Sequence, residues 1–379
     1  MVRGVNYADA GVDTTLGNEA SRIFYEASRE TWENRKGLGR IISLLNDFSG
    51  LRYIRMAGLP EGTCIGMCFD GVGTKMELAE RTGCYETVAH DVIAMGCDDA
   101  VVRGAEPFLV GSVLDVNSLG SEDENYIDQI EQLAKGYVNA AKIANVAIIN
   151  GEVAELGERV GGFGPFNCNW GAGVVWFANE KRLLTGNKIR IGDSLVGLRE
   201  KGFRSNGFSL VRKIMEENNY RYEPYKPLWR ESGKTVGDIL LTPSTIYTPA
   251  VVDMFGGWNL EREAKAEIHG VAHITGGGIP EKLGRMLRPS GFGAVLNNLF
   301  EVPELMFAIQ KLGKVSDVGA YTTLPMGCGM VIATPGPERV ISVADEHGIE
   351  GKEIGYVTRT PGIIIISRGA FSETEELVF

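Results

Sequence analysis

The feature that most constrains this chain is an octapeptide, Cys-Phe-Asp-Gly-Val-Gly-Thr-Lys, at residues 68–75. The apolar run at 64–69 predicts a short strand that ends near Asp70, and the pattern from Met76 onwards predicts a helix. The two glycines between them let backbone N–H groups face an anion at the helix start, where Lys75 adds a positive charge. The stretch predicts a phosphate site, but its residue order is not that of a Walker A loop. A strand, a glycine turn and a helix can also have a purely structural purpose.

An acidic but otherwise apolar segment follows at residues 91–102. Its apolar residues predict a helix surrounded by protein, which Gly104 ends. Asp91 and Asp98 are seven residues apart and therefore share one face of this helix. Two interpretations remain open. In one, Asp91 caps the helix and Asp98 pairs with an arginine; in the other, both carboxylates hold Mg²⁺ against the phosphates of a nucleotide.

Length and charge limit the classes of protein to consider. A chain of 379 residues exceeds what one core usually serves, so we expect two domains. The net charge of −11 argues against nucleic acid or an anionic membrane as the main partner. No apolar run is long enough to span a bilayer, and no signal peptide is recognisable, so we expect a cytoplasmic protein. The six cysteines form no C-x-x-C pair, which favours free thiols.

Further strands and one long helix complete the first half. Apolar runs predict strands at 107–114, 146–149 and 167–177, and helical periodicity predicts a helix over 126–144. Another acid, Glu152, follows the end of a predicted strand. These repeated strand–helix–strand units predict a mixed α/β fold with polar groups gathered at loops, where ligands usually bind.

A shift in composition near residue 179 marks the expected domain boundary. In the second half, the loop at 202–207 leads into a predicted helix at 208–217, whose start offers free N–H groups to a phosphate. Ser205 or Asn206 could cap this helix at the same time.

A second glycine cluster, at residues 276–278, precedes another predicted helix that has Pro280 in its first turn. His273 lies just before the cluster, where it could donate a hydrogen bond or carry a proton. A histidine in an apolar run can equally be a packed structural residue. Two phosphate-type loops with acids near them favour phosphoryl chemistry on an ATP–Mg²⁺ site.

Several of these motifs, in this order, resemble the phosphoribosylformylglycinamidine cyclo-ligase family, also called aminoimidazole ribonucleotide (AIR) synthetases. The likeness runs through most of the chain, at residues 7–13, 70–75, 91–95, 104–107, 151–155, 205–213 and 272–278. It implies an α+β (mixed α/β) fold of two domains. The first, residues 1–178, would bind ATP and form a dimeric β-barrel with a second copy; the second, residues 179–379, would be an α/β domain.

The resemblance also implies an activity. Such a homodimer would convert formylglycinamidine ribonucleotide and ATP to AIR, ADP and phosphate, a step of purine biosynthesis. Alternatives are another ATP-dependent enzyme of the same superfamily with a shifted substrate, or a nucleotide-binding homologue without turnover. Incubation with both substrates separates the three.

The matched motifs, with the local chemistry, give each candidate residue a role. The expected metal ligands are Asp70, Asp91 and Asp98. The expected catalytic residues are Lys75, Glu152, Arg204 and His273. The expected contacts to nucleotide and substrate phosphates are Asp70, Gly71, Gly73, Thr74, Lys75, Ser205, Asn206, Gly276, Gly277 and Gly278.

The chain departs from the family pattern at several supposed site positions, namely Asp99, Asn150, Pro165, Phe166, Arg204, Leu324 and Pro325. Arg204 stands where the family usually has a histidine. Because arginine stays charged and only donates hydrogen bonds, we expect Arg204 to be a fixed anion clamp. Residues 36–40 keep only two glycines of a longer glycine-rich loop, so they predict either a phosphate cover or a turn between helices.

Overall fold

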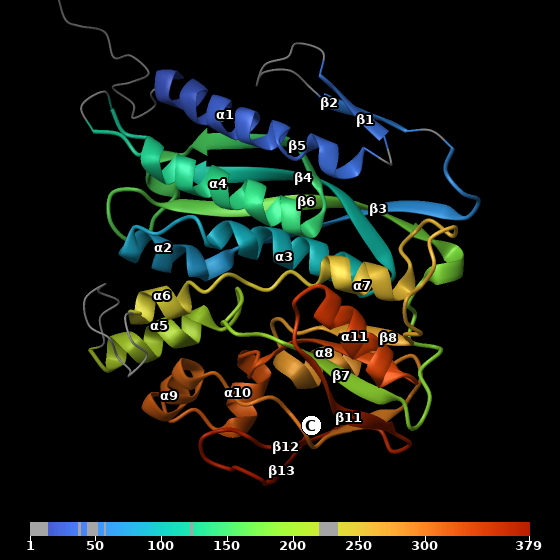
Figure 1. The fold of residues 1–379 in the computed structure, drawn as a ribbon. Coiled ribbons are helices and arrows are strands. Elements are labelled where there is room, and N and C mark those ends of the chain that lie inside the picture. The colour runs from blue at the N-terminus through green and yellow to red at the C-terminus, as the bar shows by residue number, and fades with distance from the viewer. Residues whose placement is uncertain (1–13, 37–38, 44–51, 57, 122–123, 220–233) are drawn as a thin grey trace, which may run out of the picture. The chain divides into compact units, whose positions relative to one another are not determined.

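A computed structural model describes residues 14–36, 39–43, 52–56, 58–121, 124–219 and 234–379 (Figure 1). The motif at 7–13 lies outside these residues, as does Gly37 of the glycine loop, while Gly39 begins a strand. The described residues form two compact units. The first takes residues up to 59, 67–96 and 108–175; the second takes 60–66, 97–107 and 176–379. The main division therefore falls three residues before the expected boundary, and two earlier segments join the second unit.

The first unit is built on a four-stranded sheet with the order β3-β6-β4-β5. Its strands are β3 (Thr63–Gly71), β4 (Ala105–Val116), β5 (Ala147–Glu155) and β6 (Cys168–Asn179), and β4 and β5 run parallel. Its helices are α1 (Thr14–Arg29), α2 (Met76–Thr82), α3 (Val88–Val101) and α4 (Ile127–Ala144). A separate hairpin joins β1 (Gly39–Ser43) to β2 (Arg52–Met56). The predicted strands and the long predicted helix are confirmed.

Packing explains two of these helices. In α4, Ile130, Leu133, Tyr137 and Ala141 recur at helical spacing and are all buried, as their periodicity predicts. Along α3, every residue from 91 to 101 is buried except Asp99. The helix is therefore surrounded by protein, and its buried carboxylates need partners.

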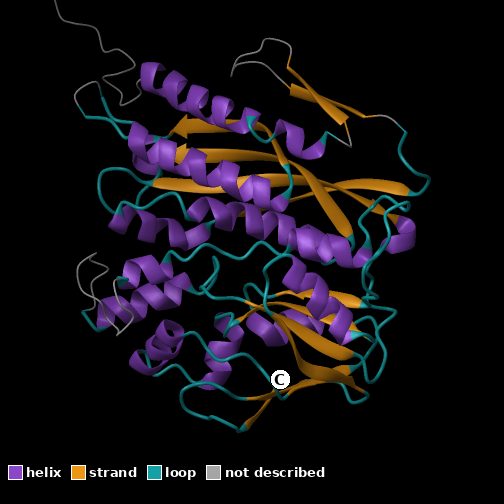
Figure 2. Cartoon of the chain, viewed as in Figure 1, coloured by secondary structure: helices purple, strands orange, loops and turns teal. Residues whose placement is uncertain are grey.

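The second unit is built on a seven-stranded sheet with the order β13-β12-β9-β11-β7-β10-β8. Figure 2 draws the strands of the chain in orange and its helices in purple. Its strands are β7 (Ser194–Arg199), β8 (Gly270–His273), β9 (Gly293–Leu296), β10 (Cys328–Thr334), β11 (Gly351–Thr358), β12 (Ile363–Ile366) and β13 (Glu376–Val378). Its helices are α5 (Phe208–Glu217), α6 (Val236–Leu240), α7 (Thr248–Phe255), α8 (Gly278–Leu287), α9 (Glu304–Leu312), α10 (Asp317–Thr323) and α11 (Pro337–Glu346). Most pairs in the sheet are antiparallel, but β12 and β9 are parallel. Among the described residues, no helix is long and apolar enough to cross a bilayer.

Candidate active site

The octapeptide folds much as its sequence predicts. Strand β3 continues through Asp70 to Gly71, and one turn of 3-10 helix at Gly73–Lys75 leads into α2. Gly73 adopts a positive φ of 66°, which favours glycine. A Cβ atom at Gly71 would lie 2.8 Å from the carbonyl oxygen of Trp170, so the neighbouring strand β6 also demands a glycine there. The side chain of Asp70 accepts a hydrogen bond from the N–H of Gly71 at 2.7 Å.

Lys75 is placed differently from the expectation. Its side chain is fully buried, and its Nζ lies 2.7 Å from Oδ2 of Asp91, which is also fully buried. Two opposite charges removed from water need each other, so α3 and the octapeptide are held together by this ion pair. Asp91 is therefore the charge partner of a lysine. The two interpretations from sequence, a helix cap and a metal ligand, did not include this pair.

Glu152 and Asp70 line one hollow on the first unit. This cavity of about 1230 Å³ lies against the four-stranded sheet and is lined by residues of α1 and of all four strands. Asp115 also lines it, and so do the exposed side chains of Met67 and Phe69. The hollow thus combines carboxylates with an apolar, glycine-rich sheet surface.

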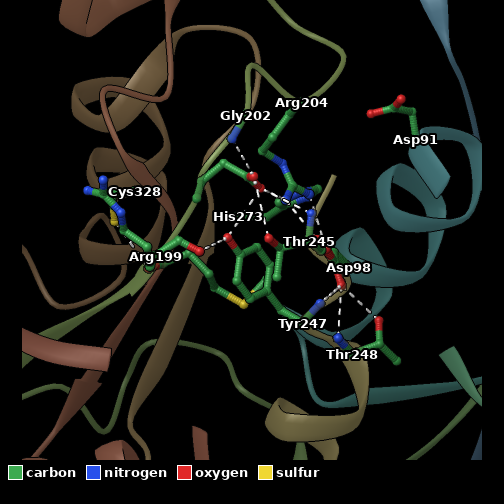
Figure 3. A network of polar contacts seen from close by, with 12 residues as sticks. Asp91, Asp98, Arg199, Gly202, Arg204, Thr245, Tyr247, Thr248, His273 and Cys328 are labelled. Carbon is green, nitrogen blue, oxygen red and sulfur yellow. Dashed lines mark hydrogen bonds and ion pairs between the residues drawn. The ribbon is translucent and has the colours of Figure 1, made fainter. Parts of the chain in front are cut away.

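In the second unit, Arg204 is the centre of a buried polar network (Figure 3). Its Nη1 donates to Oε2 of Glu200 at 2.8 Å and to the carbonyl of Thr245 at 3.0 Å. The guanidinium is fully buried and also lies over the ring of Tyr247. Burial alone lowers the pKa of Arg204, but Glu200, Tyr247 and Asp98 hold it above its ordinary value.

Asp98 meets an arginine, as one of the two sequence interpretations holds. Its Oδ2 lies 3.1 Å from Nη2 of Arg204. Its Oδ1 accepts hydrogen bonds at 2.9 Å from the N–H groups of Tyr247 and Thr248 and from the hydroxyl of Thr248. This carboxylate is saturated by protein donors and caps the start of α7.

His273 joins the network at its ring nitrogens. Nη2 of Arg204 lies 2.6 Å from its Nε2, and Oδ1 of Asp99 lies 2.6 Å from its Nδ1. The imidazole is almost fully buried, whereas the side chain of Asp99 is 46% exposed. Asp99 stands at a supposed site position where the family usually has an asparagine, but sequence analysis assigns it no role of its own. It is the one exposed residue in an otherwise buried run, and only the structure shows that.

The two glycine-containing turns lead into helix starts, as predicted. Gly207, with φ of 80°, is the N-cap of α5, and Gly277, with φ of 91°, is the N-cap of α8. The N-cap position of α5 is taken by Gly207, so neither Ser205 nor Asn206 is the N-cap residue of this helix. A Cβ atom at Gly276 would lie 3.7 Å from Oδ1 of Asn206, which shows that the turns are neighbours.

The expected metal trio is not preassembled. Among the described residues, no three His, Cys, Asp or Glu side chains gather into a group that could hold a metal ion. Asp91 is paired with Lys75, and Asp98 is paired with Arg204. The expectation that Arg204 is an anion clamp also differs from the structure, because its guanidinium is enclosed by protein acceptors.

Comparison with known proteins places this chain in a family. Residues 53–167 match the N-terminal domain of AIR synthase related proteins, and residues 190–367 match the C-terminal domain. The chain is 32% identical over 367 residues to a phosphoribosylformylglycinamidine cyclo-ligase of Picosynechococcus sp., covering 95% of this chain and 99% of that protein. The chain belongs to the AIR synthase family. A cyclo-ligase of Symbiobacterium thermophilum is 34% identical over 361 residues, with 94% and 95% covered.

Solved structures agree on the fold of this family member. Thiamine-monophosphate kinase from Stenotrophomonas maltophilia K279a superimposes with a TM-score of 0.62 at 13% identity, covering 93% of this chain and 97% of that one. Hydrogenase maturation protein HypE in complex with ATP gives a TM-score of 0.56 at 14% identity, covering 86% of each chain. The expected mixed α/β, two-domain AIR synthase-like fold is confirmed.

Proposed function

We propose that this chain is an ATP-dependent cyclo-ligase that converts formylglycinamidine ribonucleotide to AIR, with release of ADP and phosphate. The observation that carries the proposal is similarity over nearly the whole length of the chain to proteins named phosphoribosylformylglycinamidine cyclo-ligase, at 31–34% identity. Both domains of the family are matched, so the activity is not inferred from one half alone.

The reaction needs an activated amide. The amide oxygen of the substrate attacks the γ-phosphate of ATP, which releases ADP and forms an iminophosphate. A substrate nitrogen then closes the imidazole ring as phosphate leaves. Little covalent chemistry is left to the protein, whose contribution is positioning and charge. In the first unit, we assign ATP phosphates to the turn around Gly71, Gly73 and Thr74, with Lys75 as the nearby positive charge held by Asp91.

We further propose that Mg²⁺ accompanies ATP. A magnesium ion on a nucleotide usually takes only one or two protein carboxylates, together with phosphate and water oxygens, so a closed protein cage is not required. Asp70 fits this need because its carboxylate is exposed at the end of β3 beside the glycine turn. The ion would neutralise phosphate charge, and Glu152 would assist the metal or the substrate.

In the second unit, we assign the phosphate of the ribonucleotide to the turns at Ser205-Asn206 and at 276–278. Both turns precede helices of ten residues, and N–H groups at helix starts favour an anion. The side-chain oxygen of Ser205 is buried and has no partner among the described residues, so it could donate to a bound oxygen. His273 lies at the end of β8, just before the second of these turns.

We propose a homodimer formed through the first unit. The exposed side chains of Met67, Phe69 and Val113 stand on its sheet, and Phe69 is 74% exposed. Apolar side chains on a hollowed sheet surface are typical of a protein interface. A second copy of the same surface would bury them and complete the barrel that the family resemblance implies. Such an enzyme of nucleotide synthesis would work in the cytoplasm.

ATP hydrolysis tests the proposal against its alternatives. The purified protein is expected to hydrolyse ATP only when Mg²⁺ and formylglycinamidine ribonucleotide are both present. ATP hydrolysis at the same rate without that substrate would point to another ATP-dependent enzyme. Nucleotide binding without any hydrolysis would point to a non-catalytic homologue.

A further inference from the structure

Arg204 is an unusual residue in its backbone as well as in its contacts. Its φ of 55° lies in the left-handed region, which side chains other than glycine rarely adopt. Its guanidinium is fully buried and reaches three other parts of the second unit: α3 through Asp98, the start of α7 through Thr245, and β8 through His273. A backbone conformation of this kind persists only where surrounding contacts hold it.

The contact between Arg204 and His273 decides where the imidazole carries its proton. A guanidinium only donates hydrogen bonds, so Nε2 of His273, 2.6 Å from Nη2, has to accept. The ring proton is then on Nδ1, which donates to Oδ1 of Asp99 at 2.6 Å. The partners therefore assign the Nδ1–H tautomer. A neutral His273 held this way does not offer Nε2 to a substrate, so it is not free to be the proton carrier expected from sequence.

Asp99 is the end of this chain of contacts that reaches solvent. Glu200, Arg204 and Asp98 are fully buried and His273 is almost so, whereas the Asp99 side chain is 46% exposed. Burial raises the pKa of Asp99, but the hydrogen bond from His273, together with the charges of Lys282 and Arg204, holds it below its ordinary value. The network thus presents an ionised carboxylate of fixed orientation.

The same contact ties two turns together. Arg204 directly precedes the turn that starts α5, and His273 ends β8 just before the turn that starts α8. Both turns pack against the end of α10: a Cβ atom at Gly207 would lie 2.6 Å from Leu324, and one at Gly278 would lie 1.9 Å from the carbonyl of Tyr321. The bond from Arg204 to His273 therefore helps to set the spacing of the two helix starts.

We propose that Arg204 is a positioning residue that acts through His273. It fixes the Nδ1–H tautomer, directs that proton to Asp99, and holds the turns at 205–207 and 274–278 next to each other. In its consequence for substrate binding the inference rests on the proposed function, which assigns those two turns to the ribonucleotide phosphate. The prediction of the His273 tautomer does not depend on whether the protein has that activity.

The tautomer is measured by NMR of protein labelled with ¹⁵N at histidine. The chain has four histidines, so four pairs of ring nitrogens are expected, and the signals lost in His273→Gln identify His273. The expected result is a protonated Nδ1 and an unprotonated Nε2. A proton on Nε2 would overturn the inference, whether or not the protein forms AIR.

The binding consequence is measured with a matched pair of variants. The amide oxygen of glutamine stands near the position of Nε2, so His273→Gln keeps an acceptor for Arg204. Asparagine is too short to do so. We expect His273→Asn to raise KM for formylglycinamidine ribonucleotide by about 10-fold, the effect of one lost charge-assisted hydrogen bond, and His273→Gln to raise it less. Equal KM values in these two variants would overturn the inference, because a general structural defect would affect both alike.

Arg204→Met tests the arginine itself, with Arg339→Met as control. Arg339 is exposed and donates to the carbonyl of Lys265, away from both turns. We expect Arg204→Met to raise KM as His273→Asn does, while Arg339→Met keeps the parent value. A folded Arg204→Met enzyme with the parent KM would overturn the inference. If Arg204→Met does not fold, the KM values of His273→Gln and His273→Asn and the tautomer measured by NMR still test the inference. If the parent protein makes no AIR, the proposed function fails and the NMR result alone decides.

Discussion

The guanidinium of Arg204 lies 3.1 Å from the carboxylate of Asp98, and both side chains are fully buried. Asp98 belongs to the segment of α3 that clusters with the second unit, and Arg204 precedes α5 in the same unit. Through their bonds to residues 245–248, the two side chains hold three distant parts of the sequence together: α3, the loop before α5 and the start of α7. The contact explains why an acid can lie in so apolar a helix.

Asp98→Asn is expected to destabilise the protein by about 3 kcal/mol, because removing one partner of a buried ion pair leaves the other undercompensated. The neutral amide also loses a strong acceptor for three donors at the start of α7. Urea unfolding, followed by circular dichroism, gives the free energy of unfolding. Unchanged stability together with weaker Mg²⁺-ATP binding would instead support the metal-ligand role expected from sequence.

Lys75 and Asp91 form the corresponding buried pair of the first unit. We expect Lys75→Met and Asp91→Asn each to lower the free energy of unfolding by about 3 kcal/mol. The double variant should lose clearly less than the sum, since no charge is then left unpaired. A double-mutant cycle by urea unfolding measures this coupling. Additive losses would show that the two side chains do not depend on each other.

Local patterns predicted the elements of this fold well. The periodicity of Ile130, Leu133 and Tyr137 depends only on a helix of 3.6 residues per turn, and the structure has that helix at Ile127–Ala144. The strand that ends at the octapeptide was predictable for the same reason, because a short apolar run before a glycine turn is a local signal.

The contacts of the charged residues were not predictable in the same way. Arg204 meets Asp98 across 106 residues and His273 across 69, and no local pattern contains such distances. One interpretation of the sequence pairs Asp98 with an arginine, but the sequence does not say which one. The sequence predicts that Arg204 and Lys75 bind ligands, because charged residues beside glycine turns often bind anions. In the structure both side chains are buried and paired with carboxylates of the protein.

Phe69→Glu is expected to dissociate the proposed dimer. Phe69 is 74% exposed on the sheet surface of the first unit, and a carboxylate there would be buried without a partner in the interface. Sedimentation velocity compares its mass with that of the parent. The matched control is Phe371→Glu, since Phe371 is a 52% exposed phenylalanine of the second unit. A parent protein that sediments as an active monomer would remove the proposal.

Acid should weaken the fold partly through Asp99. The pKa of this carboxyl is lowered from its ordinary value of 3.8, so its stabilising contribution is complete above about pH 4 and is lost as the pH falls through the lowered value. Asp99→Asn keeps an acceptor for His273 but cannot ionise. Its free energy of unfolding is therefore expected to fall less than that of the parent as the pH falls below about 4. Urea unfolding at each pH measures both curves, and parallel curves would contradict the assignment.

The formation of AIR tests the central claim most directly. The purified protein is incubated with ATP, Mg²⁺ and formylglycinamidine ribonucleotide, and AIR, ADP and phosphate are quantified in the same sample. The cyclo-ligase assignment predicts that the three products appear in equal amounts and that no AIR forms without ATP. Consumption of ATP with no AIR, or no reaction in a folded protein that binds ATP, would contradict it.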